Sequence, residues 1–177
     1  TVSGRSGGCI EGNAVVAPDG RLFNFLRYGT DGCAPCVGRA LILEADAAAP
    51  DKPLRFHAIV PFPGNMSKFK VGYDARSLRY WSLVSRVTGD NLKQRNVLTL
   101  ISSPDLFDWR IERDILNYED NGWPEDSTKV GFQYVDWILD GEDMLVLSRT
   151  ALNGAYNHHN ANHLTFHRIR HFRQRGY

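Results

Sequence analysis

Three arginines recur at equivalent places in the sequence and could bind an anion together. Arg27, Arg86 and Arg149 each end the second strand of a predicted β-hairpin, and they lie 59 and 63 residues apart. A guanidinium group is a planar fork of N–H donors that matches the two oxygens of a carboxylate. If the hairpin ends converge, these arginines form a pocket that orients a carboxylate. The alternative interpretation is that each arginine pairs with an acid of the neighbouring repeat.

The first strand of each hairpin begins beside the arginine that ends the second strand, so its first residues share the same rim. Glu11 and Lys68 lie at two of these starts, and Glu11 is a candidate general base. Tyr134 and Asp136 open the third hairpin, where alternation places them on one face as a candidate nucleophile or acid and its carboxylate partner. The alternatives are a salt bridge from Glu11 to Arg27 and a packing role for Tyr134.

A loop rich in histidine and asparagine follows Arg149 and belongs to the same rim. His159 is a candidate general acid or base. Imidazoles and amides also suit the hydroxyl groups of sugars, so four further residues are candidates for substrate binding: His158, Asn160, Asn162 and His163. A divalent ion would also find ligands here, but no spacing specifies a metal, and we expect no cofactor. The alternative is a turn-forming loop whose histidines are incidental.

The elements that must position these residues are β-strands. The apolar segments are short and are separated by Gly, Pro, Asp and Asn, which is typical of an all-β protein. Several segments lack alternation, as strands do when both faces of their sheet are covered. Each hairpin is followed by a lone outer strand and preceded by a short segment, at residues 9–11, 64–67 and 131–133. Together these elements predict the four-stranded antiparallel blades of a β-propeller.

The repeat predicts about three blades in one all-β domain spanning residues 1–177, at roughly 8–63, 64–118 and 131–173. Three blades do not close a ring. We therefore expect the chain to be part of a five- to seven-bladed propeller whose other blades precede Thr1. Self-association and a compact sandwich are the alternatives.

Composition narrows the range of partners. A net charge of +1 argues against a nucleic-acid or membrane partner. No apolar run approaches the roughly 20 residues that span a bilayer, and we expect any secretory signal to have been removed. Among the three cysteines, Cys33 and Cys36 have the spacing of a redox pair or half a zinc site. Their glycine-rich flanks favour a structural loop, with a local disulfide as one form of it.

Several segments resemble one family of proteins. Residues 102–109, with the sequence SSPDLFDW, resemble a degenerate Asp-box, the turn between outer strands in sialidase-type propellers. Residues 132–137, 148–151 and 157–168 are similar to the C-terminal part of bacterial sialidase-like (BNR-repeat) glycosidases. The resemblance implies a β-propeller that acts on carbohydrate and an extracellular or periplasmic location.

The resemblance also implies roles for individual residues. Arg27, Arg86 and Arg149 would form the cluster that holds an acidic sugar. Tyr134 and Glu11 would match the tyrosine–glutamate nucleophile pair of sialidases.

Three functions follow as hypotheses. The first is a glycoside hydrolase of sialidase-like type, or a part of one, that removes a terminal, acidic sugar. The second is a polysaccharide lyase in which His158 or His159 and Tyr134 abstract the proton beside a uronate carboxylate. The third is a propeller that binds carbohydrate without catalysis. An unsaturated uronate product identifies the lyase, whereas a released reducing sugar identifies the hydrolase.

Overall fold

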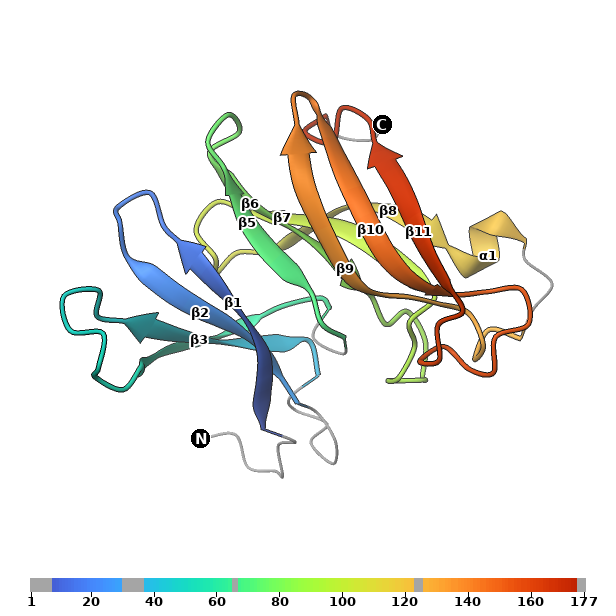
Figure 1. The fold of residues 1–177 in the computed structure, drawn as a ribbon, viewed down its shortest axis with the longest axis horizontal. Coiled ribbons are helices and arrows are strands. Elements are labelled where there is room, and N and C mark those ends of the chain that lie inside the picture. Colours follow the sequence, from blue (N-terminus) through green and yellow to red (C-terminus); the bar gives the residue numbers. More distant parts are fainter. Residues whose placement is uncertain (1–7, 30–36, 65–66, 123–125, 175–177) are drawn as a thin grey trace.

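The fold of the chain is all-β in the computed structural model, which describes residues 8–29, 37–64, 67–122 and 126–174. Within these ranges, eleven strands form three antiparallel sheets, and one short helix, α1 (Tyr118–Asn121), follows the second sheet. The sheets follow one another along the molecule, with the second between the first and the third (Figure 1). The expected all-β propeller architecture is confirmed.

In each sheet the strands lie side by side in the order in which the chain makes them. The first sheet contains β1 (Cys9–Val16), β2 (Leu22–Tyr28), β3 (Arg39–Ala45) and β4 (Arg55–Pro61). The second contains β5 (Lys70–Asp74), β6 (Arg79–Ser85), β7 (Val97–Ser103) and β8 (Arg110–Asn117). The third contains β9 (Gly131–Asp140), β10 (Asp143–Ala151) and β11 (His163–Ile169).

This arrangement corrects the predicted composition of the blades. Residues 9–11 and 131–133 are the beginnings of β1 and β9, not separate strands. Of the expected segment 64–67, Gly64 and Ser67 lie outside the strands, and residues 65–66 lie outside the described residues. The fourth strand of the first two sheets follows the third strand, as β4 and β8. The sequence signal missed β8 because its charged residues interrupt any apolar run. The third sheet has three strands within the described residues, where four were expected.

Two apolar cores fill the spaces between neighbouring sheets. The first core joins the first and second sheets through residues such as Phe25, Phe62 and Phe69. The second core joins the second and third sheets through Trp81 and Trp137, among others. The second sheet is therefore covered on both faces, and β7 is buried along its whole length. That environment explains why apolar residues stand next to each other in β7, as in Val97–Leu98 and Leu100–Ile101.

Side chains connect the innermost strands β1, β5 and β9, whose free edges face one another (Figure 1). The Asn13 side chain accepts a hydrogen bond from the backbone N–H of Val71 (3.3 Å) and donates one to the carbonyl of Phe25 (3.3 Å). Lys70 donates to the carbonyl of Trp137 (2.7 Å), whose indole N–H donates to the Lys70 carbonyl (3.3 Å). Backbone groups at the strand edges are thus satisfied by the neighbouring sheet.

The turn between β7 and β8 is closed by one carboxylate and one indole. Asp105 accepts hydrogen bonds from the backbone N–H groups of Phe107 (2.8 Å) and Asp108 (2.9 Å). Burial alone would raise the pKa of Asp105, but these donors and Ser103 bring it below its usual value. The indole of Trp109 donates to the carbonyl of Leu106 (2.9 Å) and closes the turn.

We expect Gly72→Ala to destabilise the protein, because a Cβ at this position would lie 2.6 Å from the Trp137 ring. Such overpacking lowers the free energy of unfolding by about 1–3 kcal/mol. Chemical denaturation measures the change. The control is Gly89→Ala, where a Cβ meets no atom within 4 Å and should leave the stability nearly unchanged. Equal stability of the two variants would contradict the close packing of the second and third sheets.

We also expect the protonation of Asp74 to make the free energy of unfolding depend on pH in the acid range. Burial raises its pKa, but hydrogen bonds from Arg173 and Ser77 lower it overall to about 2. A depressed native pKa gives stability that is present above the unfolded value of about 4 and is lost as the pH falls toward about 2. The unfolding free energy of Asp74→Asn should therefore depend less on pH over this interval. An exposed control, Asp90→Asn, should keep the wild-type profile.

Candidate functional site

The first and third sheets share an irregularity at the start of their inner strands. In β1 the register shifts between Ile10 and Asn13, and Glu11 has a left-handed φ of 56°. In the third sheet it shifts between Leu147 and Arg149, and Tyr134, opposite this step in β9, has a φ of 53°. Both are β-bulges, which redirect a side chain out of strand alternation. Because a non-glycine residue with this φ is uncommon, two at equivalent places mark the rim as a candidate site.

The first bulge brings the carboxylate of Glu11 into contact with Arg27. Arg27 Nη1 donates to Glu11 Oε2 over 2.9 Å, and the side chains are only 18% and 21% exposed. The alternative interpretation of Glu11 as a salt-bridge partner of Arg27 thus describes this geometry. Arg27 and Glu11 do share one rim, but Arg27 does not stand as an uncompensated cation there.

The second bulge gathers a tyrosine, an arginine and a histidine. The guanidinium carbon of Arg149 lies 4.9 Å from the centre of the Tyr134 ring. Arg149 Nη2 donates to the backbone carbonyl of His159 (3.0 Å), and the His159 ring lies edge-on to Tyr134 at 6.5 Å. Cation–π attraction and the hydrogen bond hold Arg149 between the other two residues. Three of the predicted site residues therefore lie together.

A fourth arginine, which the repeat did not reveal, lies between the two bulges. Arg95 precedes β7, and its carbonyl accepts a hydrogen bond from the backbone N–H of Phe132, near the start of β9. Nε and Nη1 of Arg95 are buried and have no hydrogen-bond partner within the described part of the chain. Burial and the charge of Arg27 lower the pKa of Arg95 to about 10, whereas Tyr134 and Glu11 act in the opposite direction.

Arg95 is therefore a cationic group with unused donors close to both bulges. A buried N–H without a partner costs free energy, which a bound anion or carbonyl would recover. The sequence carries two weak signals for it: the run Gln94-Arg95-Asn96 in an otherwise turn-like segment, and the general excess of arginine. Neither signal distinguishes Arg95 from a solvated loop residue.

The position of Arg86 contradicts the prediction that three arginines converge. Its Nη2 donates to Asp114 Oδ2 on β8 (2.6 Å), and its Nε donates to the hydroxyl of Thr99 on β7 (3.1 Å). The side chain thus extends across its own sheet, away from the inner strand. The acid that compensates it comes from β8, the strand that the sequence pattern missed.

The pairing of Tyr134 with Asp136 is also corrected. The bulge at Tyr134 interrupts the alternation that would place both on one face. Asp136 instead accepts a hydrogen bond from Lys70 Nζ (2.6 Å), and this bond lowers the pKa of Asp136. The charge of Lys68, which lies in the segment before β5, acts on the pKa of Asp136 in the same direction.

The loop after β10 is held mainly by its backbone. Gln133 donates its side-chain amide to the carbonyls of His158 (2.6 Å) and His159 (3.2 Å). Asn162 joins both backbone groups of Leu152, which closes the loop. His158 Nδ1 lies 3.2 Å from the Thr128 carbonyl, and burial is the main cause of its lowered pKa. His159 is therefore the loop residue that meets Tyr134 and Arg149.

The remaining predicted residues lie at the margin of this loop. Asn160 is exposed, and its backbone N–H donates to Asn157 (2.8 Å). His163 is exposed at the start of β11, opposite Thr150. Cys9 is an exposed free thiol, whereas Cys33 and Cys36 lie outside the described residues. Within the described ranges, no three His, Cys, Asp or Glu side chains come together as metal ligands.

A polar pocket adjoins Arg95 on the side of the third sheet. Asp90, Asn91, Glu119, Thr128 and His158 are among the residues that line it. Arg95 thus connects this pocket with the bulges. The described part of the chain contains no helix with the length and apolar character needed to cross a membrane.

Comparison with known proteins identifies similar folds. No protein-family model and no curated protein sequence matches the chain. Among solved structures, an α-L-arabinofuranosidase from Fusarium graminearum is similar, with a TM-score of 0.61 and 11% identity over 97% of this chain. A leech intramolecular trans-sialidase has a TM-score of 0.56 and 13% identity over 90% of this chain. A GH43 β-1,3-galactosidase has a TM-score of 0.52 and 12% identity over 90% of this chain.

The chain spans 48%, 23% and 30% of the lengths of these three proteins. At such identities the similarity shows the fold and does not select a reaction.

We expect the substitutions Arg95→Met and Arg86→Met to change the free energy of unfolding in opposite directions. Arg95→Met removes unpaired buried donors and should raise the free energy of unfolding by about 1 kcal/mol. Arg86→Met leaves Asp114 without its partner and should lower it by about 1–3 kcal/mol. Urea denaturation measures both changes. A loss of stability in Arg95→Met would contradict the view that Arg95 is retained for a ligand.

From these strands, bulges and similarities, the chain is identified as a three-sheet part of a β-propeller fold that also occurs in glycoside hydrolases.

Proposed function

We propose that the chain carries the acidic-sugar site of a sialidase-like glycoside hydrolase, which removes a terminal sugar in exo fashion. The rim site consists of Glu11, Arg27, Arg95, Tyr134, Arg149 and His159. The observation that carries the proposal is the pair of buried, unpartnered donors of Arg95, between two β-bulges. A carboxylate is the group that best satisfies an unpaired guanidinium.

Charge at the rim site supports an anionic substrate. Arg27, Arg95 and Arg149 contribute three cations, and Glu11 compensates one of them through its 2.9 Å bond to Arg27. Arg149 contacts an aromatic ring and a backbone carbonyl, both of which leave its charge uncompensated. The excess of positive charge in a partly buried rim attracts a carboxylate-bearing sugar.

The same residues suit a retaining hydrolysis. The Tyr134 oxygen would attack the anomeric carbon while Glu11 accepts the phenolic proton, and the bond to the leaving sugar breaks. His159, which is exposed, would give the leaving oxygen its proton. Water would then release the sugar from the tyrosine and restore the starting protonation states. Asp136 stays a second candidate acid, compensated by Lys70.

One observation favours a carbohydrate-binding propeller without catalysis as the second candidate. Both candidate carboxylates are paired, Glu11 with Arg27 and Asp136 with Lys70. Such pairing weakens a carboxylate as a base. In either case we propose a carbohydrate ligand and an extracellular or periplasmic location, on the basis of the resemblance and of the glycosidases with this fold.

Calorimetric titration tests the rim site as a carboxylate site. The wild-type chain should bind N-acetylneuraminic acid or a uronic acid and should bind the methyl ester at least about 10-fold more weakly, because the ester lacks the charge. Arg95→Met should remove this preference, whereas the control Arg113→Met on β8 should keep it. Equal binding of acid and ester by the wild-type protein would contradict the proposal.

A fluorogenic sialoside and a fluorogenic uronide distinguish catalysis from binding. Turnover that Tyr134→Phe reduces about 100-fold or more, with the exposed Tyr156→Phe as unaffected control, supports the hydrolase. Binding without turnover supports the second candidate. An ultraviolet-absorbing unsaturated product would contradict both proposals and would identify the protein as a lyase.

A further inference from the structure

Gln133 is a buried amide at the start of β9, directly before Tyr134. The residue is only 1% exposed, although glutamine is mostly found at protein surfaces. Its Nε2 donates hydrogen bonds to the backbone carbonyls of His158 (2.6 Å) and His159 (3.2 Å). The two N–H groups of the amide therefore bind two consecutive carbonyls of the loop after β10.

These two bonds fix the orientation of the amide. A carbonyl oxygen only accepts hydrogen bonds, so Nε2 must face the loop, and a rotated amide would place Oε1 against both carbonyls. In the observed orientation, Gln133 Oε1 is buried and has no hydrogen-bond partner among the residues that the structure describes. A buried acceptor without a partner costs free energy. The contact with the loop thus determines how Gln133 lies, although it leaves one polar atom unsatisfied.

The loop approaches β9 closely because residue 131 is a glycine. A Cβ on Gly131 would lie 2.9 Å from the carbonyl oxygen of His158 and 3.3 Å from Cβ of Arg95. The first of these distances is shorter than a side-chain carbon normally reaches. Gly131 therefore leaves the space for the loop, and Gln133 supplies the donors that hold it.

The carbonyl of His159 also accepts a hydrogen bond from Arg149. Arg149 Nη2 donates to it over 3.0 Å, and Arg149 lies opposite Gln133 in the register of β10 and β9. The guanidinium carbon of Arg149 lies 4.9 Å from the centre of the Tyr134 ring. Because Gln133 and Arg149 share one acceptor, the place of the guanidinium depends on the carbonyl that Gln133 holds.

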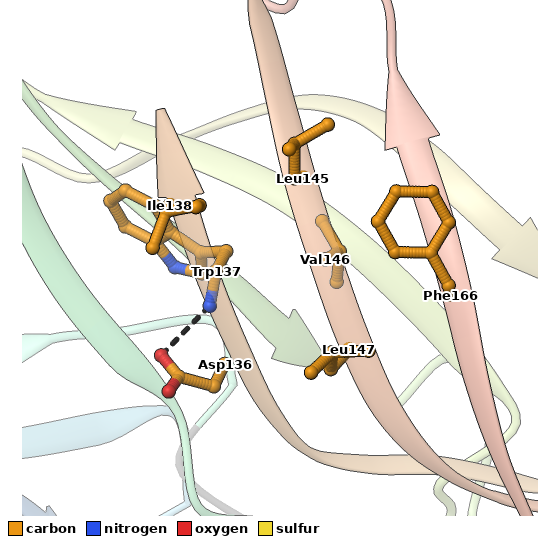
Figure 2. Close-up of a pocket in the computed structure, with 7 residues that line it drawn as sticks. All are labelled: Asp136, Trp137, Ile138, Leu145, Val146, Leu147 and Phe166. Carbon is orange, nitrogen blue, oxygen red and sulfur yellow. Dashed lines mark hydrogen bonds between the residues drawn. The ribbon is translucent and has the colours of Figure 1, made fainter. Parts of the chain in front are cut away.

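The neighbouring part of the third sheet offers Arg149 no comparable acceptor. Its outward side chains surround a shallow pocket and are mainly apolar, as Figure 2 shows for Ile138, Leu145, Leu147 and Phe166. The carboxylate of Asp136 accepts from the backbone N–H of Trp137 (2.8 Å, Figure 2) and from Lys70 (2.6 Å). The His159 carbonyl is therefore the acceptor that determines where the guanidinium lies.

We propose that Gln133 is a positioning residue, which holds the guanidinium of Arg149 over Tyr134 through the His159 carbonyl and so strengthens the preference of the rim site for a carboxylate. The effect on carboxylate preference rests on the proposed function of the rim site, whereas the position of the guanidinium does not. A free arginine side chain has many rotamers, and ordering it on binding costs free energy. Gln133 lowers this cost, because Arg149 is ordered before the ligand arrives.

Nuclear magnetic resonance of the arginine side chains tests the position without a ligand. Protons above an aromatic ring resonate upfield, so the guanidinium signals of Arg149, identified by their loss in Arg149→Lys, should be shifted upfield. Gln133→Met removes both hydrogen bonds and should abolish this shift. The matched control, Ser85→Ala, removes another buried hydrogen bond to β9, from Ser85 to the Phe132 carbonyl (2.8 Å), and should leave the signals unchanged.

Calorimetric titration measures the effect on recognition. The wild-type chain should bind the sugar acid at least about 10-fold more tightly than its methyl ester. Gln133→Met should lower this ratio below about 3-fold, since Arg149 is no longer ordered beforehand, whereas Ser85→Ala should keep it.

Gln133→Glu adds a readout that depends on pH. A buried carboxyl group that faces two carbonyl oxygens favours its protonated form, which can donate one hydrogen bond. The acid-to-ester ratio of this variant, relative to the wild-type ratio at the same pH, should therefore rise as the pH falls from about 8 to about 5. Gln133→Glu also keeps the size of the side chain, so it provides the comparison if circular dichroism shows that Gln133→Met does not fold.

The two measurements separate the positioning role from the proposed function. Upfield signals of Arg149 that persist in Gln133→Met overturn the positioning role, as does an equal loss of the shift in Ser85→Ala. An unchanged acid-to-ester ratio in Gln133→Met also overturns the effect on recognition. A wild-type protein that binds acid and ester equally, while Gln133→Met still loses the upfield shift, contradicts the proposed function and leaves Gln133 as the residue that positions Arg149.

Discussion

The structure depends on how the innermost strands satisfy their free edges. A sheet edge presents unpaired N–H and C=O groups, and here β1, β5 and β9 meet edge to edge without forming a common sheet. Asn13, Lys70 and Trp137 bridge them with side-chain hydrogen bonds. Because these bonds fix the three sheets against one another, the strand starts come to one rim and two cores become closed. The positions of Glu11 and Tyr134 at the rim follow from this registration, whereas Arg95 and His159 reach the rim from loops.

The rim itself is a compromise between stability and recognition. Two left-handed residues, Glu11 and Tyr134, and a buried guanidinium with unused donors, Arg95, all raise the free energy of the unliganded protein. Other buried polar groups of the sheets are satisfied, as in the bond from Ser85 to the Phe132 carbonyl (2.8 Å), whereas the Ser82 hydroxyl and the Gln133 side-chain oxygen also have no partner among the described residues. The other left-handed non-glycine residues, such as Leu78 and Leu106, lie outside the strands, whereas Glu11 and Tyr134 lie within strands at equivalent places. Unfavourable features that meet in this way at the rim are typical of a site that is completed by a ligand.

Strand patterns predicted the fold class and part of the rim, since hairpins place Glu11 beside Arg27 and Tyr134 beside Arg149 by geometry alone. They did not predict Arg95, which enters the rim from a loop with no repeat to mark it. They also assigned Arg86 to the cluster, because the acid that binds it, Asp114, lies on β8. The charged residues of β8 prevented its recognition as a strand from the sequence pattern. Local periodicity reports strands, whereas the partner of a long side chain depends on tertiary contacts.

The bond between Arg173 and Asp74 has a consequence for synthesis of the protein. Arg173 binds the carboxylate through two nitrogens, at 2.7 and 2.9 Å, across a separation of 99 residues. Phe172 packs edge-on against Trp81 of the same sheet. Asp74 also accepts hydrogen bonds from the backbone N–H and the hydroxyl of Ser77, so Arg173 is the charged partner that completes its surroundings. During synthesis the turn between β5 and β6 therefore gains this charged partner only after the chain has been made as far as residue 173.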